Sequence, residues 1–213
     1  MPKAKALTPR QEDRRQRILS AAREMVADHG YEGMVMSQVA ERAEVSPTTL
    51  YNLYNTKDQL VMESLRELLQ EQARQVWSEA EGPGWQFLYA SVKNGADMAN
   101  AEPSYADAIL VALQRARAGD ELISVLLEAN NLNIERSLKA MAKRGELAAG
   151  VDERELAIAL NGVYWSSFIM WNKGFIRLQE LEHAILRNFL SMLIPSTTTA
   201  TRKALEAKLR ELG

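Results

Sequence analysis

The sequence is poor in the residues that carry most covalent and metal chemistry. Its 213 residues include no cysteine and only two histidines, His29 and His183, which are far apart. The absence of cysteine excludes disulfides, thiolate nucleophiles and cysteine-ligated zinc or iron–sulfur clusters. Two distant histidines also argue against a histidine-rich metal site. We therefore expect neither a metal nor a cofactor.

Long hydrophobic runs and enzyme motifs are also missing. The most membrane-like stretch, 156–172, has 17 residues and contains Asn161, Ser166 and Ser167, so it is too short and too polar to span a bilayer comfortably. No apolar stretch of signal-peptide length follows the basic start of the chain, so we expect a cytoplasmic protein with no membrane partner. Nucleophile elbows, phosphate-binding glycine loops and zinc-helix motifs are absent, which predicts that the protein is not an enzyme.

Positive charge is concentrated at one end of the chain. The net charge is −2, but residues 1–23 alone carry +5, so the remainder carries −7. The cations there are Lys3, Lys5, Arg10, Arg14, Arg15, Arg17 and Arg23. This asymmetry predicts an anionic partner, with Arg14 as a candidate contact. The alternative is a solvated helix face, because Glu12 and Asp13 lie among the arginines.

Apolar residues recur with a period near 3.6 almost throughout, and no strand-like alternation is convincing, which predicts an all-α fold. We expect a first helix from the capping pattern at Thr8 to the His29–Gly30 pair, short helices starting at Ser37 and Ser46–Pro47, and a long helix capped by Thr56 and Gln59. Gly82–Pro83–Gly84 breaks the chain. The helices expected beyond it cover residues 85–100, 104–118, 120–144, 153–173, 178–193 and, after a linker, 200–212.

The two short helices joined by a tight turn are typical of a helix-turn-helix, whose second helix lies in the major groove of DNA. Thr48, Thr49 and Asn52 carry the short donors and acceptors that read base edges. Phosphate oxygens would be reached by side chains or by helix N-termini. The candidates for those contacts are Tyr51, Tyr54, Lys57, Ser37, Gln38 and Thr56. Tyr54 could instead belong to the core, and Lys57 could be an ordinary solvated cap residue.

Four segments resemble the N-terminal domain of tetracycline-repressor-type (TetR family) transcriptional regulators. They are Gly30-Tyr31-Glu32-Gly33, Val39-Ala40-Glu41-Arg42-Ala43, Val45-Ser46-Pro47-Thr48-Thr49-Leu50-Tyr51 and Lys57-Asp58-Gln59-Leu60. The resemblance implies that Pro47, Thr48, Thr49 and Asn52 face the bases. It further implies that Tyr51 contacts a base or the backbone and that Lys57 contacts a phosphate. It covers about 50 residues; the remaining chain matches the family only in length and helical organisation.

Two positions depart from the family pattern. Glu44 occupies the place of the usual turn glycine, so we expect backbone strain or a different turn geometry there. Leu53–Tyr54 replaces an aromatic-or-histidine residue followed by phenylalanine, so position 53 cannot make the customary phosphate contact. Neither departure breaks the motif.

The later helices contain polar residues that a pure core would avoid. Burying an amide without a partner costs roughly 1 to 3 kcal/mol, so these residues must face water, another subunit or a ligand. Residues 153–173 present two neighbouring faces, one with Asn161, Trp165 and Phe168, the other with Leu160, Tyr164, Ser167 and Trp171. We favour the first as the wall of a ligand pocket, with Tyr105 and Asn130 as neighbours. Ordinary core aromatics and exposed asparagines are the alternative.

The resemblance implies a homodimer built from the last two long helices. The apolar stripe suited to this role comprises Leu181, Ile185, Leu186, Phe189 and Met192. Two-fold pairing also has a physical motive, since one recognition helix touches too few bases and a dimer reads a palindrome. No Lys or Arg stands among the pocket candidates, so the effector is expected to be neutral or largely apolar.

These patterns together predict a DNA-binding helix-turn-helix domain over residues 1–56, a connecting helix over 57–80, an effector-binding and dimerisation domain over 81–194, and a linker with a short helix over 195–213. The function predicted is that of a repressor that binds a double-stranded palindromic operator and is released by a small molecule. The alternative is a helical ligand-binding or protein-interaction module that no longer reads DNA.

Overall fold

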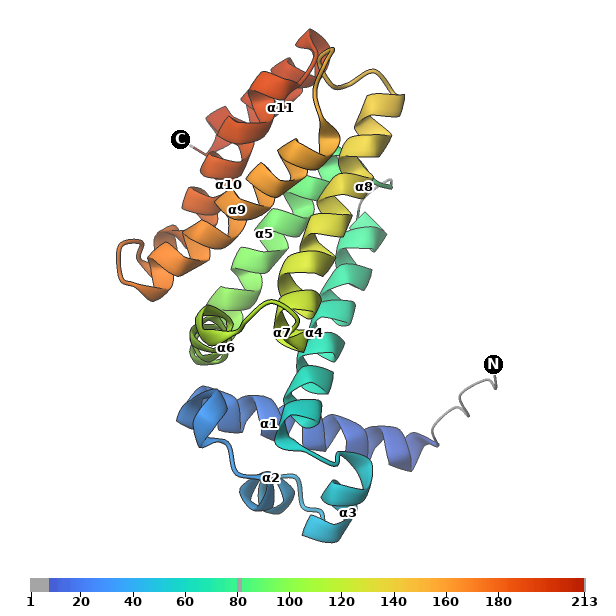
Figure 1. Ribbon diagram of the computed structural model, residues 1–213, viewed down its shortest axis with the longest axis vertical. Helices are drawn as coiled ribbons and strands as arrows, with labels where there is room; N and C mark the ends of the chain where they lie inside the picture. The colour runs from blue at the N-terminus through green and yellow to red at the C-terminus, as the bar shows by residue number, and fades with distance from the viewer. Residues whose placement is uncertain (1–7, 80–81, 213) are drawn as a thin grey trace. The chain divides into compact units, whose positions relative to one another are not determined.

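The computed structural model describes residues 8–79 and 82–212, and it confirms the all-α fold (Figure 1). Apart from one isolated bridge between Leu147 and Thr197, the described residues form helices and connecting turns. The chain divides into two compact units. The first comprises residues up to 69 together with 104–109, and the second comprises 70–103 and 110 onward. No helix within the described ranges is long and apolar enough to cross a membrane.

The first unit contains α1 (Pro9–Gly33), α2 (Met36–Arg42), α3 (Pro47–Leu53) and the start of α4 (Lys57–Glu79). The expected capping box at the start of α1 is present, because Gln11 N donates to Thr8 Oγ1 and Thr8 N donates to Gln11 Oε1. The core of this unit is apolar and fully enclosed. Its largest side chains are Ile18, Leu19, Met25, Leu50 and Leu60.

Two predicted helix ends differ from the structure. The first helix was expected to end at His29–Gly30, and Gly30 does leave helical geometry, with φ 73° and ψ 170°, but helical turns continue to Gly33. The second helix starts at Met36 and not at Ser37. Its N-cap residue is Val35, which has no side-chain acceptor, so α2 begins without a side-chain cap.

The turn between α2 and α3 has the strain expected from Glu44. This residue has φ 54° and is the one described non-glycine residue with positive φ. The left-handed conformation lets Val45 N donate to Ala40 O at 2.9 Å, which closes the end of α2. Arg17 supports the turn from α1, donating to Ala43 O at 2.7 Å and lying 3.5 Å from the Glu44 carboxylate.

We expect Glu44→Gly to raise the free energy of unfolding by about 0.5 to 1 kcal/mol, because the strain of a side chain in the left-handed region exceeds the entropy cost of glycine and the loss of an exposed ion pair. Urea denaturation measures the change. Glu41→Gly is the matched control, since Glu41 lies within helical α2 and glycine there should lower stability by a similar amount. Equal losses at both positions would contradict the strain at Glu44.

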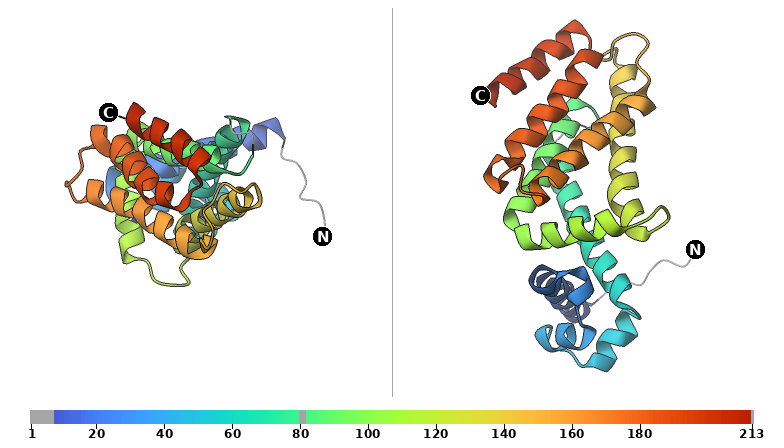
Figure 2. Two further views of the ribbon diagram at one scale, coloured as in Figure 1. Left: turned by 90° about the horizontal axis from the view of Figure 1, so that it is seen from above. Right: turned by 60° about the vertical axis from the view of Figure 1, so that its left-hand side comes forward.

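The second unit is a helical bundle. It contains α5 (Trp85–Ala101), the end of α6 (Pro103–Arg115), α7 (Glu121–Ile123), α8 (Ala129–Lys143), α9 (Glu153–Asn172), α10 (Leu178–Leu193) and α11 (Thr199–Glu211). α10 packs against α9, α5 and α11, and α8 packs against α9 and α5. The views in Figures 1 and 2 agree that α9 (orange) and α10 (red-orange) lie side by side.

Two segments of this unit differ from the secondary structure that the sequence predicts. The predicted helix 120–144 is interrupted by a π-helix, Ser124–Glu128, between α7 and α8. The stretch after α10, predicted as a linker, forms a 3₁₀ turn over Ile194–Ser196. Thr197 is then buried, and its hydroxyl donates to Ile194 O at 2.7 Å. The linker prediction missed this because short hydroxyl residues bond locally to the backbone as readily as they form loops.

Candidate functional site

The exposed face of α3 is the first candidate site. Ser46 caps the helix, accepting from Thr49 N at 3.1 Å, and Leu50 is fully buried beneath it. The outward residues are Pro47, Thr48, Tyr51 and Asn52, all exposed. Thr49 differs from them, since it is half-buried and its hydroxyl lies 2.8 Å from Ser46 Oγ. The structure therefore brings four of the five predicted α3 contacts to one surface and commits the fifth to the cap.

Lys57 is held at the first residue of α4. Its ammonium donates to Glu32 O at 3.1 Å and lies 5.5 Å from the centroid of the Tyr31 ring. Tyr31 in turn donates to Asp58 at 2.7 Å. Lys57 is thus a positioned cation beside α3, held by the Glu32 carbonyl and lying 3.9 Å from the Glu32 carboxylate.

The cap of α4 differs slightly from the predicted capping box. Thr56 Oγ1 accepts from Gln59 N at 3.1 Å, as expected. The Gln59 side chain accepts from Asn55 N at 3.0 Å and not from Thr56 N. Thr56 is exposed, as are Ser37 and Gln38 in the first turn of α2. These residues are accessible at helix N-termini, where backbone N–H groups favour anions.

Tyr54 belongs to the core of the first unit. Only 7% of its surface is exposed, and burial raises the pKa of its hydroxyl. Of the two interpretations of this residue, its placement favours the core one over a phosphate contact. The neighbouring Leu53 is exposed and apolar, so no cationic or hydroxyl group follows Asn52 on this surface.

The basic start of the chain is largely neutralised by the chain itself. Arg15 donates to Glu63 at 2.9 Å and to Glu67, and Arg23 lies 3.7 Å from Glu67. Arg17 is engaged by the turn described above. Arg10 and the half-buried Arg14 have no ion pair within the described ranges, which makes them the free cations of α1, whereas Lys3 and Lys5 lie outside those ranges. Arg15, Arg17 and Arg23 are therefore used in contacts within the first unit, an outcome that differs from both an anionic partner and a solvated helix face.

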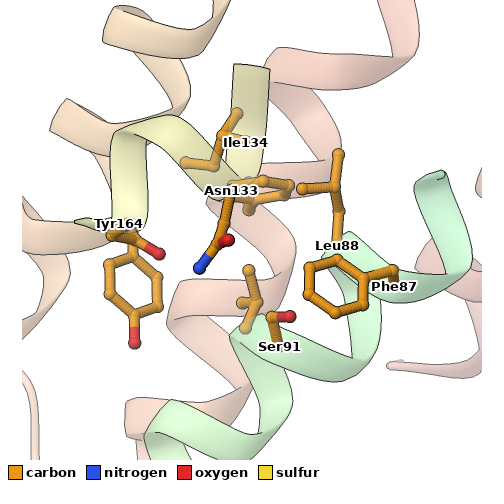
Figure 3. A pocket seen from close by; sticks show the side chains of 9 residues that line it. Phe87, Leu88, Ser91, Asn133, Ile134 and Tyr164 are labelled. Carbon is orange, nitrogen blue, oxygen red and sulfur yellow. The ribbon is translucent and has the colours of Figure 1, made fainter. Parts of the chain in front are cut away.

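The second candidate site is a cavity of about 50 Å³ inside the second unit. It lies between α5, α8, α9 and α10 and carries no Lys, Arg, Asp or Glu in its wall. Its lining residues are Phe87, Leu88, Ser91, Val92, Asn130, Asn133, Ile134, Tyr164 and Phe189. Figure 3 shows Tyr164 and Phe87 on opposite sides of the cavity, with the Asn133 side chain between them.

Of the predicted pocket residues, the structure places only Asn130 in the wall of this cavity. Asn161 lies behind it, accepting from Asn130 Nδ2 at 2.8 Å and donating to Leu127 O at 3.1 Å. Leu127 is part of the π-helix, so this hydrogen bond joins α9 to the π-helical segment. The two asparagine side chains are therefore hydrogen-bonded to each other and to a backbone carbonyl. This role was not predicted from the sequence.

The opposite face of α9 faces the cavity. Tyr164 lines it, whereas Trp165 and Phe168 pack beside Tyr164 with ring centroids 5.3 and 5.0 Å from its ring. Burial raises the pKa of the Tyr164 hydroxyl, so the phenol stays neutral. Tyr105 lies in the part of α6 that groups with the first unit, outside the set of lining residues. The predicted face of Asn161, Trp165 and Phe168 does not line this cavity, and its contact with an effector stays a prediction.

Gly95 of α5 makes room for Tyr164. A Cβ at position 95 would collide with the Tyr164 hydroxyl, which is buried and cannot swing away freely. We expect Gly95→Ala to lower the free energy of unfolding by about 1 kcal/mol, because overpacking outweighs the gain in helix propensity. Thermal denaturation tests this. The control is the same substitution in a Tyr164→Phe background, where the colliding hydroxyl is gone and alanine should cost less. A stabilised Gly95→Ala protein would contradict the close approach.

The apolar stripe predicted for the dimer interface belongs to the core of the second unit. Leu181, Ile185, Leu186 and Phe189 are each at most 1% exposed, and Phe189 also lines the cavity. Only Met192 is at the surface, with 40% of its area exposed. The sequence shows which residues of α10 are apolar, but not that α5 and α9 cover them within the same chain.

A different stripe is open on the outer face of α9. Ile158, Gly162, Ser166 and Met170 are all exposed and recur every four residues, so they lie along one side of the helix. Ile158 is 56% exposed and Met170 is 42% exposed. Two small residues lie between two apolar ones, an arrangement that allows close packing against another helix. The pattern was missed because its central residues are not apolar.

Comparison with known proteins supports the helix-turn-helix. Residues 18–63 match the family described as bacterial regulatory proteins, tetR family. Over 56 residues the chain is 36% identical to the HTH-type transcriptional regulator YdeS of Bacillus subtilis, which is uncharacterised, covering 26% of this chain and 28% of YdeS. Over 55 residues it is 42% identical to the HTH-type transcriptional repressor KstR of Rhodococcus jostii, covering 26% of each protein. The chain thus matches less than a third of the length of these curated relatives.

Solved structures extend the similarity of fold to most of the chain. A transcriptional regulator FadR from Bacillus subtilis in complex with stearoyl-CoA has a TM-score of 0.68 at 19% identity, covering 83% of this chain and 98% of that one. SmeT, the repressor of the Stenotrophomonas maltophilia multidrug efflux pump SmeDEF, has a TM-score of 0.73 at 14% identity, covering 89% and 94%. At these identities the similarity shows the shared fold alone.

Proposed function

Because the chain belongs to the TetR family of transcriptional regulators, which are not enzymes, we propose that it is a cytoplasmic repressor that binds a palindromic operator as a homodimer and is released by a small molecule. In this proposal residues 1–56 bind DNA and 57–80 connect the domains. Residues 81–194 bind the effector and dimerise, and residues 195–213 form the C-terminal segment. The observation that carries the proposal is the exposed polar face of α3.

That face has the chemistry needed to read a base sequence. Thr48 and Asn52 present a hydroxyl and an amide that can pair with base edges, and the threonine methyl can pack on thymine. Tyr51 is half exposed and can reach the sugar–phosphate backbone. Lys57 supplies the positive charge at the edge of the face. Contacts of this kind position the protein through phosphates and specify sequence through bases.

Dimerisation is supported by the open stripe on α9 and by the exposed Met192 of α10. We assign the interface to Ile158, Gly162, Ser166 and Met170, together with Met192 of α10. A two-fold axis through such a surface would repeat each contact. The dimer would then present two recognition helices, one for each half of a palindromic operator. This assignment replaces the predicted stripe on α10, except for Met192.

The cavity supports an effector that is neutral or largely apolar. Its wall offers aromatic and aliphatic side chains together with Ser91, Asn130, Asn133 and Tyr164 as hydrogen-bonding groups. The Bacillus subtilis FadR is in complex with stearoyl-CoA. The apolar wall of this cavity would accept the acyl chain of such a molecule, but it contains no Lys or Arg to pair with the phosphates. Ligand pockets commonly enclose about 300 Å³ or more, so a cavity of about 50 Å³ must widen when the effector enters.

The test is a selection of genomic fragments by the purified protein near physiological salt, followed by sequencing and footprinting of the best site. We expect a compact palindromic footprint that weakens on Lys57→Ala and persists on Lys203→Ala, which removes an exposed lysine from α11. Binding without sequence preference would overturn the operator proposal and favour the ligand-binding or protein-interaction module instead.

A further inference from the structure

The two hydrogen bonds that join Asn130, Asn161 and Leu127 have only one possible direction. The Leu127 group is a backbone carbonyl, which accepts and never donates, so the atom that lies 3.1 Å from it is the amide nitrogen of Asn161. The carbonyl oxygen of Asn161 then faces Asn130, and it accepts from the Asn130 amide nitrogen at 2.8 Å. One backbone carbonyl thus sets the orientation of both side-chain amides.

The unused group of Asn130 is therefore an acceptor. Its amide nitrogen is committed to Asn161, and its carbonyl oxygen accepts no hydrogen bond from the residues that the structure describes. The carbonyl oxygen of the neighbouring Asn131 is buried without a partner, whereas that of Asn130 is accessible. Rotating the Asn130 amide by half a turn would set two carbonyl oxygens against each other. Because Asn130 lines the cavity, it offers a fixed acceptor to whatever enters.

The other polar groups of the wall adapt to either kind of partner. Ser91 of α5 carries a hydroxyl that donates or accepts, and Asn133 of α8 carries an amide that does both. Within the described ranges neither side chain is hydrogen-bonded, and both lie at the cavity in Figure 3. Tyr164 contributes its ring, while its hydroxyl lies against Gly95 of α5. Asn130 is therefore the residue that distinguishes ligands by the direction of their hydrogen bond.

The absence of charge in the wall narrows the choice of ligand further. With no Lys or Arg there, an anionic group would lack a counter-charge and would also meet the Asn130 oxygen. With no Asp or Glu there, a cationic group would lose its hydration without gaining an ion pair. The remaining wall, which includes Phe87, Leu88 and Phe189, suits an apolar body. A neutral hydrogen-bond donor on an apolar body satisfies each of these conditions.

We propose that the cavity takes a neutral ligand with an apolar body and an O–H or N–H donor, such as an alcohol or a phenol, and that this donor binds the carbonyl oxygen of Asn130. Asn161 is a positioning residue, because it holds the Asn130 amide in the accepting orientation. The inference rests on the proposed function and names the chemical class of the effector. Ethers and carboxylates, whose oxygens only accept, bind less tightly than alcohols of equal size.

Four probes of similar size test this class of ligand. 2-Phenylethanol carries the donor, and its isomer benzyl methyl ether has the same atoms without a donor. Phenylacetate and 2-phenylethylammonium add a negative or a positive charge to the same aromatic body at pH 7. Each is titrated into the isotopically labelled full-length protein without DNA, and NMR shifts give the dissociation constant. We expect the alcohol to bind about 10-fold more tightly than the ether, which leaves the Asn130 oxygen unpaired, and more tightly than either ion.

Two asparagine variants locate the preference. In Asn130→Leu the fixed acceptor is gone, so the alcohol and the ether should bind within about 2-fold of each other. Asn131→Leu is the matched control, because Asn131 is the next residue of α8, donates to Glu135 at 3.2 Å and does not line the cavity. It should keep the preference of the unaltered protein. Circular dichroism verifies that each variant is folded, and Asn130→Ala gives the same comparison if Asn130→Leu does not fold.

A third variant tests the positioning role of Asn161. In Asn161→Ala the Asn130 amide loses the partner that fixes it, so it can rotate and donate to the ether oxygen. The ether should gain affinity while the alcohol changes little, so that the preference falls below about 3-fold. A merely structural role would weaken both probes together and leave their ratio unchanged, which would contradict the positioning role.

Several outcomes would overturn the inference. They are equal affinity for the alcohol and the ether in the unaltered protein, tighter binding of phenylacetate than of the alcohol, no saturable binding of any probe, and a preference that persists in Asn130→Leu. Because no DNA is present, each of them would leave the operator proposal to its own test. A preference for the alcohol in a protein that binds no operator would support the inference and count against the proposed function alone.

Discussion

Thr48→Glu is expected to lower operator affinity about 100-fold or more while leaving the protein folded. The substitution removes a base-reading group and directs a carboxylate at a polyanion, once in each subunit of the proposed dimer. Thr48 is exposed in the first turn of α3, where a negative side chain interacts favourably with the helix N-terminus. Fluorescence anisotropy with the footprinted fragment at fixed salt gives the change in affinity, and thermal denaturation verifies the fold.

Thr199→Glu is the matched control for this substitution. Thr199 is the exposed first residue of α11, so the same change adds the same charge at another helix N-terminus. It should leave operator affinity within about 2-fold, because one surface charge remote from DNA is largely screened at physiological salt. If the two variants lose affinity equally, the loss reflects net charge and not the face of α3.

Ile158→Glu is expected to convert the proposed dimer to a monomer. A carboxylate buried without a partner costs about 3 kcal/mol or more, and a two-fold interface buries it twice, so the dimer dissociation constant should rise at least 100-fold. Sedimentation velocity at micromolar protein would show the change. Operator affinity should fall with it, since a single recognition helix reads only half of a palindrome.

Leu132→Glu separates an interface effect from a general surface effect. Leu132 is an exposed apolar residue of α8 with 64% of its area accessible, more than Ile158, and it lies outside the α9 stripe. This variant should remain a dimer with normal operator affinity. A wild-type protein that is monomeric, or an Ile158→Glu protein that remains dimeric, would overturn the interface assigned to α9.

The helical architecture could be predicted from the sequence because its signals are local. Apolar periodicity and capping residues placed most helices within a few residues of their observed ends, including α9 and α10. The strain at Glu44 was also predictable, since a tight turn that usually holds glycine imposes its backbone geometry on any residue there. In each case the residues next to one another in the sequence were sufficient to predict the backbone conformation.

The residues of the second candidate site could not be predicted from the periodicity of apolar residues alone. Tyr164 and Trp165 are adjacent and equally aromatic, and Tyr164 faces the cavity because Gly95 of α5 leaves space for its hydroxyl. Similarly, Leu181 and Ile158 are both apolar residues on long helices. Only the packing of the neighbouring helices determines that Leu181 is buried within the chain and Ile158 is exposed.

The π-helix at Ser124–Glu128 has a consequence for length variation in this part of the chain. A π turn holds one residue more than an α turn, so deleting one residue from this segment would restore a continuous α-helix through α7 and α8. Because the shortened turn still completes one revolution, the deletion would keep Leu122 facing the core. A deletion beside Leu127 would displace the carbonyl that accepts from the Asn161 amide at 3.1 Å and so leave that amide without its acceptor. A relative one residue shorter here should therefore carry an apolar residue at the position of Asn161.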